Sequence, residues 1–109
     1  MRRVDEEGAG HRHLRVQSLV LEELRALLRD DVTDPALGDV RAVAVVLSVD
    51  YRHARVHFVL DPGSAGAGDL RVVQRALERA TPFLRARLAE AIEMKRVPDL
   101  RFVFDGGAG

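Results

Sequence analysis

The stretch Ala80-Thr81-Pro82 decides the fold, because it interrupts an amphipathic helical pattern running from about Asp69 to about Met94. Proline lacks a backbone N–H and clashes with the preceding helical turn, so a helix is not expected to continue through Pro82. Thr81 then suits an N-cap and Pro82 the first position of a new helix. The pattern predicts two helices joined by a kink with almost no loop.

Three segments around this helical pair have the character of strands. Residues 40–49 are rich in valine, which predicts a strand buried on both faces. Residues 54–60 alternate apolar and polar side chains, which predicts a half-buried strand that pairs antiparallel with the first. Residues 100–104 alternate in the same way and predict the last strand.

A first helix is predicted from Leu14, where apolar residues begin to recur at helical spacing. It should end before the turn Asp34-Pro35-Ala36-Leu37-Gly38, because the residue before a proline disfavours helix. The order is then helix, strand, strand, helix, kink, helix, strand. It predicts an α+β fold in which the helices cover one face of a three-stranded sheet.

Glycine-rich and charged segments mark the expected boundaries. Residues 1–12 are predicted to form a flexible leader and residues 106–109 a flexible C-terminal end, which leaves a single domain over 13–105. Residues 61–68 read as a flexible connector, with Asp69 as the cap of the next helix. Gly63-Ser64-Ala65-Gly66 in this connector matches the Gly-x-x-Gly of KH domains but lies between a strand and a helix, so it reads as linker.

The composition excludes several classes of protein. The 109 residues include no cysteine, which rules out disulfides and thiolate zinc sites. No apolar stretch reaches the ~20 residues of a membrane span, and the start lacks the apolar run of a signal peptide. No catalytic constellation is recognisable, so no enzymatic activity, cofactor or metal is expected. The formal net charge of zero argues against general binding to polyanions.

Positive charge is nevertheless concentrated around the kink. Arg71, Arg75 and Arg79 recur every four residues and should share one face of their helix. A helix N-terminus at Thr81 would add partial positive charge. The pattern is typical of a surface that follows phosphates, although a solvated face of an arginine-rich protein explains it equally.

Aromatic residues are few. Phe58, Phe83, Phe102 and Phe104 fall in apolar stripes and are predicted to lie in the core. Tyr51, in the hairpin turn, could stack on a base, but covering the sheet edge is the simpler interpretation.

Four short stretches, in order, match one bacterial family. They are Arg15-Val16 with Glu23-Leu24 and Leu27-Leu28, then Asp34-Pro35-Ala36-Leu37-Gly38, then Ser48-Val49-Asp50-Tyr51-Arg52-His53-Ala54-Arg55-Val56, and finally Arg96-Val97-Pro98-Asp99-Leu100-Arg101-Phe102. With the order of elements, they make the region from Leu14 to Asp105 resemble ribosome-binding factor A, an assembly factor of the small ribosomal subunit with a type II KH-like fold. In that family an Ala-x-Gly kink replaces the KH loop. Ala80 matches its alanine, and Pro82 stands at its glycine.

The resemblance implies a non-enzymatic, cytoplasmic, monomeric protein. It would bind the immature 30S subunit, assist 16S rRNA maturation, and be released with assembly GTPases involved. The alternative is a KH-like adaptor that binds protein without contacting RNA, which the zero net charge and Pro82 favour. The candidate RNA-binding residues flank the kink and are Arg71, Arg75, Arg79, Ala80, Thr81, Arg85, Arg87, Lys95 and Arg96.

Overall fold

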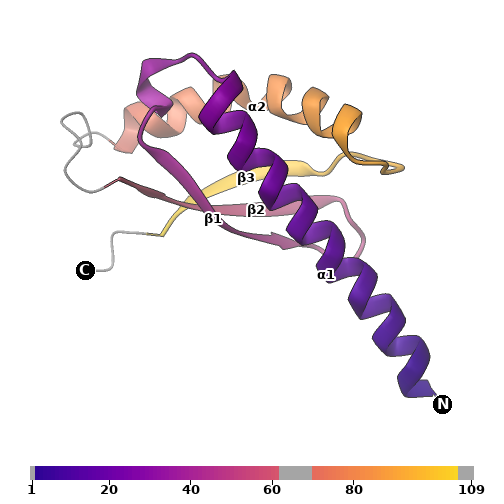
Figure 1. Ribbon diagram of the computed structural model, residues 1–109. Coiled ribbons are helices and arrows are strands. Elements are labelled where there is room, and N and C mark those ends of the chain that lie inside the picture. The colour runs from indigo at the N-terminus through magenta and orange to yellow at the C-terminus, as the bar shows by residue number, and fades with distance from the viewer. Residues whose placement is uncertain (1, 62–69, 106–109) are drawn as a thin grey trace.

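The computed structural model describes residues 2–61 and 70–105 (Figure 1). The elements are helix α1 (Arg2–Ala26), a π-helical turn (Leu27–Asp31), a 3-10 turn (Pro35–Leu37), strand β1 (Val40–Leu47), strand β2 (His53–Leu60), helix α2 (Leu70–Ala91) and strand β3 (Asp99–Phe104). The expected connector beyond Asp61, the cap at Asp69 and the C-terminal end over 106–109 lie outside the described residues.

Strand β2 is the centre of a three-stranded sheet in the order β1-β2-β3. It pairs antiparallel with β1 and parallel with β3, so that Val56 stands opposite Val45 on one side and Phe102 on the other. The predicted hairpin and last strand are confirmed, each within a few residues. The α+β fold class is confirmed as well.

One face of the sheet is buried under the helices. Ala54, Val56 and Phe58 of β2 are fully buried in a core that also includes residues of α1 and α2. The prediction that residues 40–49 are buried on both faces is wrong, because Val43 and Val46 remain 38% and 42% exposed on β1. The helices lie on one side only, so alternate side chains of β1 face outward.

Helix α2 is a single helix with Pro82 inside it, so the prediction of two helices is wrong. Thr81 is not an N-cap, and its Oγ1 instead donates to the carbonyl of Leu77 at 2.8 Å. Proline costs a helix interior about 3 kcal/mol, whereas each fully buried leucine contributes about 1.5–3 kcal/mol. Leu77 and Leu84, on either side of Pro82, are both fully buried. The free energy gained by burying the apolar side chains of one continuous helix therefore outweighs the local cost of Pro82.

Helix α1 begins at Arg2 and crosses residue 12, so the leader predicted over 1–12 is not a separate segment over its described residues. Once a helix is nucleated, each added residue gains a backbone hydrogen bond at little further cost. The middle of α1 is fastened to the end of β1. The Leu47 N–H donates to Gln17 Oε1 at 2.8 Å, and His13 Nε2 lies 2.8 Å from the Leu47 carbonyl oxygen.

Candidate nucleic-acid interface

The first half of α2 carries three exposed arginines at four-residue spacing, as predicted. Arg71 and Arg75 lie in its first two turns, and Arg79 follows one turn later. Arg79 Nη2 pairs with Asp34 Oδ2 at 3.0 Å. Asp34 also caps the 3-10 turn by accepting the Ala36 N–H at 3.0 Å. That bond, followed by the Arg79 guanidinium, holds the pKa of Asp34 below its usual value.

Arg87 is neutralised in a similar way. Its Nη2 pairs with Asp31 Oδ2 at 3.0 Å, and its Nε lies 3.4 Å from Glu90. The guanidinium also stands 5.6 Å from the centre of the Phe83 ring. Phe83 is 40% exposed, so its predicted place in the core is wrong. The attraction between the Arg87 guanidinium and the face of the ring stabilises Phe83 in this partly exposed position.

Arg85 points toward the protein rather than toward solvent. Its Nε donates to the Pro98 carbonyl at 3.1 Å and its Nη2 to the Val97 carbonyl at 2.9 Å. The Asp99 carboxylate is 3.7 Å away. These contacts fasten α2 to the chain entering β3, and they give Arg85 a structural role.

The centre of the predicted site offers little to a ligand. Ala80 is half-buried against the core, and the Thr81 hydroxyl is occupied by the Leu77 carbonyl. Because α2 is continuous, its backbone amides here have helical partners, and no helix N-terminus stands at Thr81. The partial positive charge expected at this position is therefore absent.

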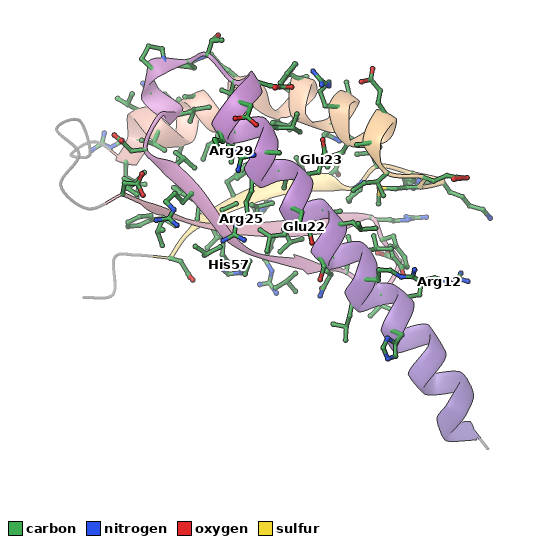
Figure 2. All side chains as sticks on the ribbon, in the orientation of Figure 1. Arg12, Glu22, Glu23, Arg25, Arg29 and His57 are labelled. Carbon is green, nitrogen blue, oxygen red and sulfur yellow. The ribbon has the colours of Figure 1, made fainter. Side chains whose placement is uncertain are left out.

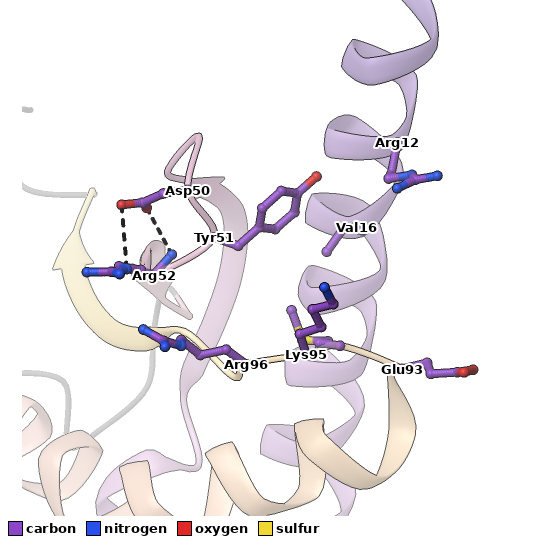
Figure 3. A pocket seen from close by; sticks show the side chains of 9 residues that line it. Arg12, Val16, Asp50, Tyr51, Arg52, Glu93, Lys95 and Arg96 are labelled. Carbon is purple, nitrogen blue, oxygen red and sulfur yellow. Dashed lines mark hydrogen bonds and ion pairs between the residues drawn. The ribbon is translucent and has the colours of Figure 1, made fainter.

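Lys95 and Arg96 lie beyond the end of α2, where they are exposed. With Arg12 and Arg52 they line a hollow of about 630 Å³ between α1, the β1–β2 turn and the segment that follows α2 (Figure 3). Sequence reasoning missed Arg12 and Arg52, because they belong to segments distant in sequence and neither stands in a periodic pattern. Only the three-dimensional fold brings these four cations together.

Elsewhere the surface charge is mixed. Glu22 and Glu23 lie on α1 close to Arg25 and Arg29 (Figure 2). Arg29 pairs with the neighbouring Asp30 at 3.0 Å, and Arg25 Nε donates to the Ala42 carbonyl at 3.0 Å. The C-terminal half of α1 therefore does not add unpaired positive charge to the surface that carries Arg71, Arg75 and Arg79 on α2.

Neither a metal site nor a membrane-spanning helix stands in the part of the chain that the structure describes. Among the side chains that the structure describes, over residues 11–61 and 70–105, no three or more His, Asp or Glu residues are arranged to hold a metal ion. Among these same residues, no helix is both long and apolar enough to cross a membrane.

A three-stranded sheet with an antiparallel hairpin, a parallel third strand and helices on one face defines a KH-like α+β domain. The model of the family described as Ribosome-binding factor A matches residues 12–108. The chain belongs to the ribosome-binding factor A family.

Individual relatives agree with this membership. The chain is 43% identical to ribosome-binding factor A of Heliobacterium modesticaldum over 97 residues, which cover 89% of this chain and 78% of the relative. It is 37% identical to that of Dechloromonas aromatica, covering 84% and 71%. The crystal structure of ribosome-binding factor A from Thermus thermophilus is similar with a TM-score of 0.70 and 28% identity, over 84% of this chain and 93% of that one. A Thermus thermophilus homology model fitted into a cryo-EM map of a complex with 30S has a TM-score of 0.61 and 29% identity, covering 91% and 97%.

Proposed function

We propose that this protein is a cytoplasmic assembly factor that binds the small (30S) ribosomal subunit and assists 16S rRNA maturation without catalysing a reaction. Membership of the ribosome-binding factor A family over nearly the whole chain carries this proposal. The similar Thermus protein fitted into a 30S complex gives it a physical partner. The protein would act as a monomer, with assembly GTPases taking part in its release.

The RNA contacts would come from two groups of cations at opposite ends of α2. Arg71 and Arg75 lie at its start, and Lys95 and Arg96 follow its end. Phosphate groups attract such side chains strongly enough to dominate most protein–RNA affinities. Arg79 and Arg87 could join only by exchanging an aspartate for a phosphate, whereas Arg85 is committed to the loop before β3.

Co-sedimentation with purified immature 30S subunits over a range of salt concentrations tests this proposal. Binding through phosphates should weaken with salt by roughly 0.7 log units per neutralised phosphate for each tenfold rise. Arg71→Glu combined with Arg75→Glu should reduce binding and flatten the slope. Arg41→Glu is the control, because Arg41 is an exposed arginine on the sheet rather than on α2, and it pairs with Asp61. Equal binding by the double variant and the control would refute an RNA contact through α2.

A KH-like adaptor that binds a ribosomal protein is the second candidate. The ion pairs of Arg79 and Arg87 and the continuous helix at Pro82 favour it, because both remove phosphate-binding groups from the expected RNA site. If the protein is such an adaptor, its binding to 30S subunits should hardly change with salt and should survive the charge reversals on α2.

A further inference from the structure

The hollow beside the hairpin turn has the size and charge of a ligand site. Its volume of about 630 Å³ falls within the range of roughly 300–1,000 Å³ found for small-molecule pockets. The residues that line it include four cations, Arg12, Arg52, Lys95 and Arg96, and two carboxylates, Asp50 and Glu93. Only Arg52 is paired with one of these carboxylates among the contacts described, with its Nε 4.0 Å from Asp50 Oδ2. The charge balance therefore favours an anionic ligand.

Tyr51 forms the aromatic part of this hollow. Its ring projects from the β1–β2 turn toward α1 (Figure 3), where it meets the His13 ring edge-on, with centroids 5.2 Å apart. The backbone φ of Tyr51 is 64°, a left-handed conformation that is unfavourable for a bulky side chain. Such outliers persist where the surrounding structure holds them and often mark binding sites.

Short contacts hold the turn that carries Tyr51 and Arg52. The Tyr51 N–H donates to the Ser48 carbonyl at 2.9 Å, and the Arg52 carbonyl accepts the Asp99 N–H at 2.9 Å. Asp50 accepts the Ser48 hydroxyl at 2.7 Å and the Arg52 N–H at 3.0 Å. These two bonds, that of Ser48 first, hold the pKa of Asp50 below its usual value. The turn thus holds the backbone of Tyr51 and Arg52 in place before any ligand arrives.

We propose that this hollow binds one unpaired nucleotide of an RNA strand, whose base stacks on Tyr51 while Arg12, Lys95 and Arg96 hold its adjoining phosphates. The inference rests on the proposed function, because it takes RNA as the partner. A base within a duplex has no free face, whereas an unpaired base can stack on an aromatic ring. A free mononucleotide offers the same base and phosphate, so the experiment must separate the two sources.

Tyr51 provides its own probe, because the chain has one tyrosine and no tryptophan. We expect a single-stranded oligoadenylate to quench the tyrosine fluorescence of the full chain after correction for absorption by the strand, and the same strand paired with oligouridylate to leave it unchanged. AMP should act only at far higher concentration than the strand. No change with the single strand would overturn the proposal. An effect of AMP at the same concentration as the strand would overturn it too, in favour of a free-nucleotide site.

Variants separate stacking from general charge. Fluorescence polarisation of a labelled single strand should show a loss of roughly 5- to 150-fold in affinity for Tyr51→Leu. Tyr51→Phe keeps the ring and should bind as the wild type does. Arg96→Glu should weaken binding and reduce its salt dependence, whereas the distant Arg41→Glu should change neither. A Tyr51→Leu variant that melts like the wild type and binds the strand equally well would overturn the stacking role.

Sedimentation with 30S subunits distinguishes this inference from the proposed function. Subunit binding by the wild type with no response to single strands would overturn the nucleotide site and leave the proposed function intact. Failure of the wild-type protein to bind 30S subunits would overturn both the nucleotide site and the proposed function. Reduced subunit binding by Tyr51→Leu, restored in Tyr51→Phe, supports the inference.

Discussion

Pro82 lies inside α2, and Pro82→Ala is expected to stabilise the protein. Because proline has no N–H, the Glu78 carbonyl one turn earlier lacks its usual helical partner. Alanine supplies that donor and removes the clash of the ring with the preceding turn. Pro82 is exposed, so the smaller side chain leaves no cavity in the core.

The size of the gain can be bounded. The full penalty of proline relative to alanine in a helix interior, about 3 kcal/mol, is the upper limit. One recovered backbone hydrogen bond, with a net contribution of about 1 kcal/mol, is the lower limit. For a domain of this size, 1 kcal/mol raises the melting temperature by about 4–8 °C. Even the lower limit is therefore measurable.

Thermal and urea denaturation followed by circular dichroism would provide the assay. Pro35→Ala is the matched control, because Pro35 occupies the first position of a 3-10 turn, where a missing N–H removes no helical bond. The control should melt close to the wild type. If Pro82→Ala melts at or below the wild-type temperature, tertiary packing itself requires the proline, and the missing hydrogen bond at Glu78 does not limit the stability of the protein.

Two further changes test ion pairs that sequence reasoning had not assigned. Arg85→Ala should lower the free energy of unfolding by about 1–2 kcal/mol in urea denaturation, because the carbonyls of Val97 and Pro98 lose their charged donors while the site stays 40% exposed to water. Unchanged stability with weaker RNA binding would instead return Arg85 to the RNA surface. Asp34→Asn should keep the bond from the Ala36 N–H but lose the pair with Arg79. Because the folded protein lowers the pKa of Asp34, its contribution to stability is present above the unfolded pKa and disappears as the pH falls through the folded one. The difference in melting temperature between wild type and Asp34→Asn should therefore narrow from about pH 7 to about pH 2. An equal difference at the two pH values would contradict a stabilising role of the ionised Asp34 carboxylate.

Local patterns predicted the sheet well, because strand alternation directly records which side faces a core. Ala54, Val56 and Phe58 alternate in the sequence and are buried in β2. The continuity of α2 was not predictable in this way. The rule against proline is local, whereas the buried stripe that overrides it requires α1 and the sheet to be in place. For β1, valine content alone did not reveal that one face stays exposed.

The candidate site was predictable in composition but not in arrangement. The spacing of Arg71, Arg75 and Arg79 correctly indicated one exposed face of α2. No local signal announced that Asp31 and Asp34, more than forty residues earlier, would pair with Arg87 and Arg79. A charge whose partner comes from a distant segment looks the same in sequence as an unpaired one.

The parallel pairing of β2 with β3 also orders events during synthesis. The hairpin of β1 and β2 can form as soon as both strands have left the ribosome, but β3 is made only after all of α2. Until then one edge of β2 has no partner, and Phe58 lacks the Phe104 ring that lies 5.6 Å away in the finished fold. An open edge of this kind readily pairs with other chains. The nascent protein is therefore most prone to aggregate just before its last strand emerges.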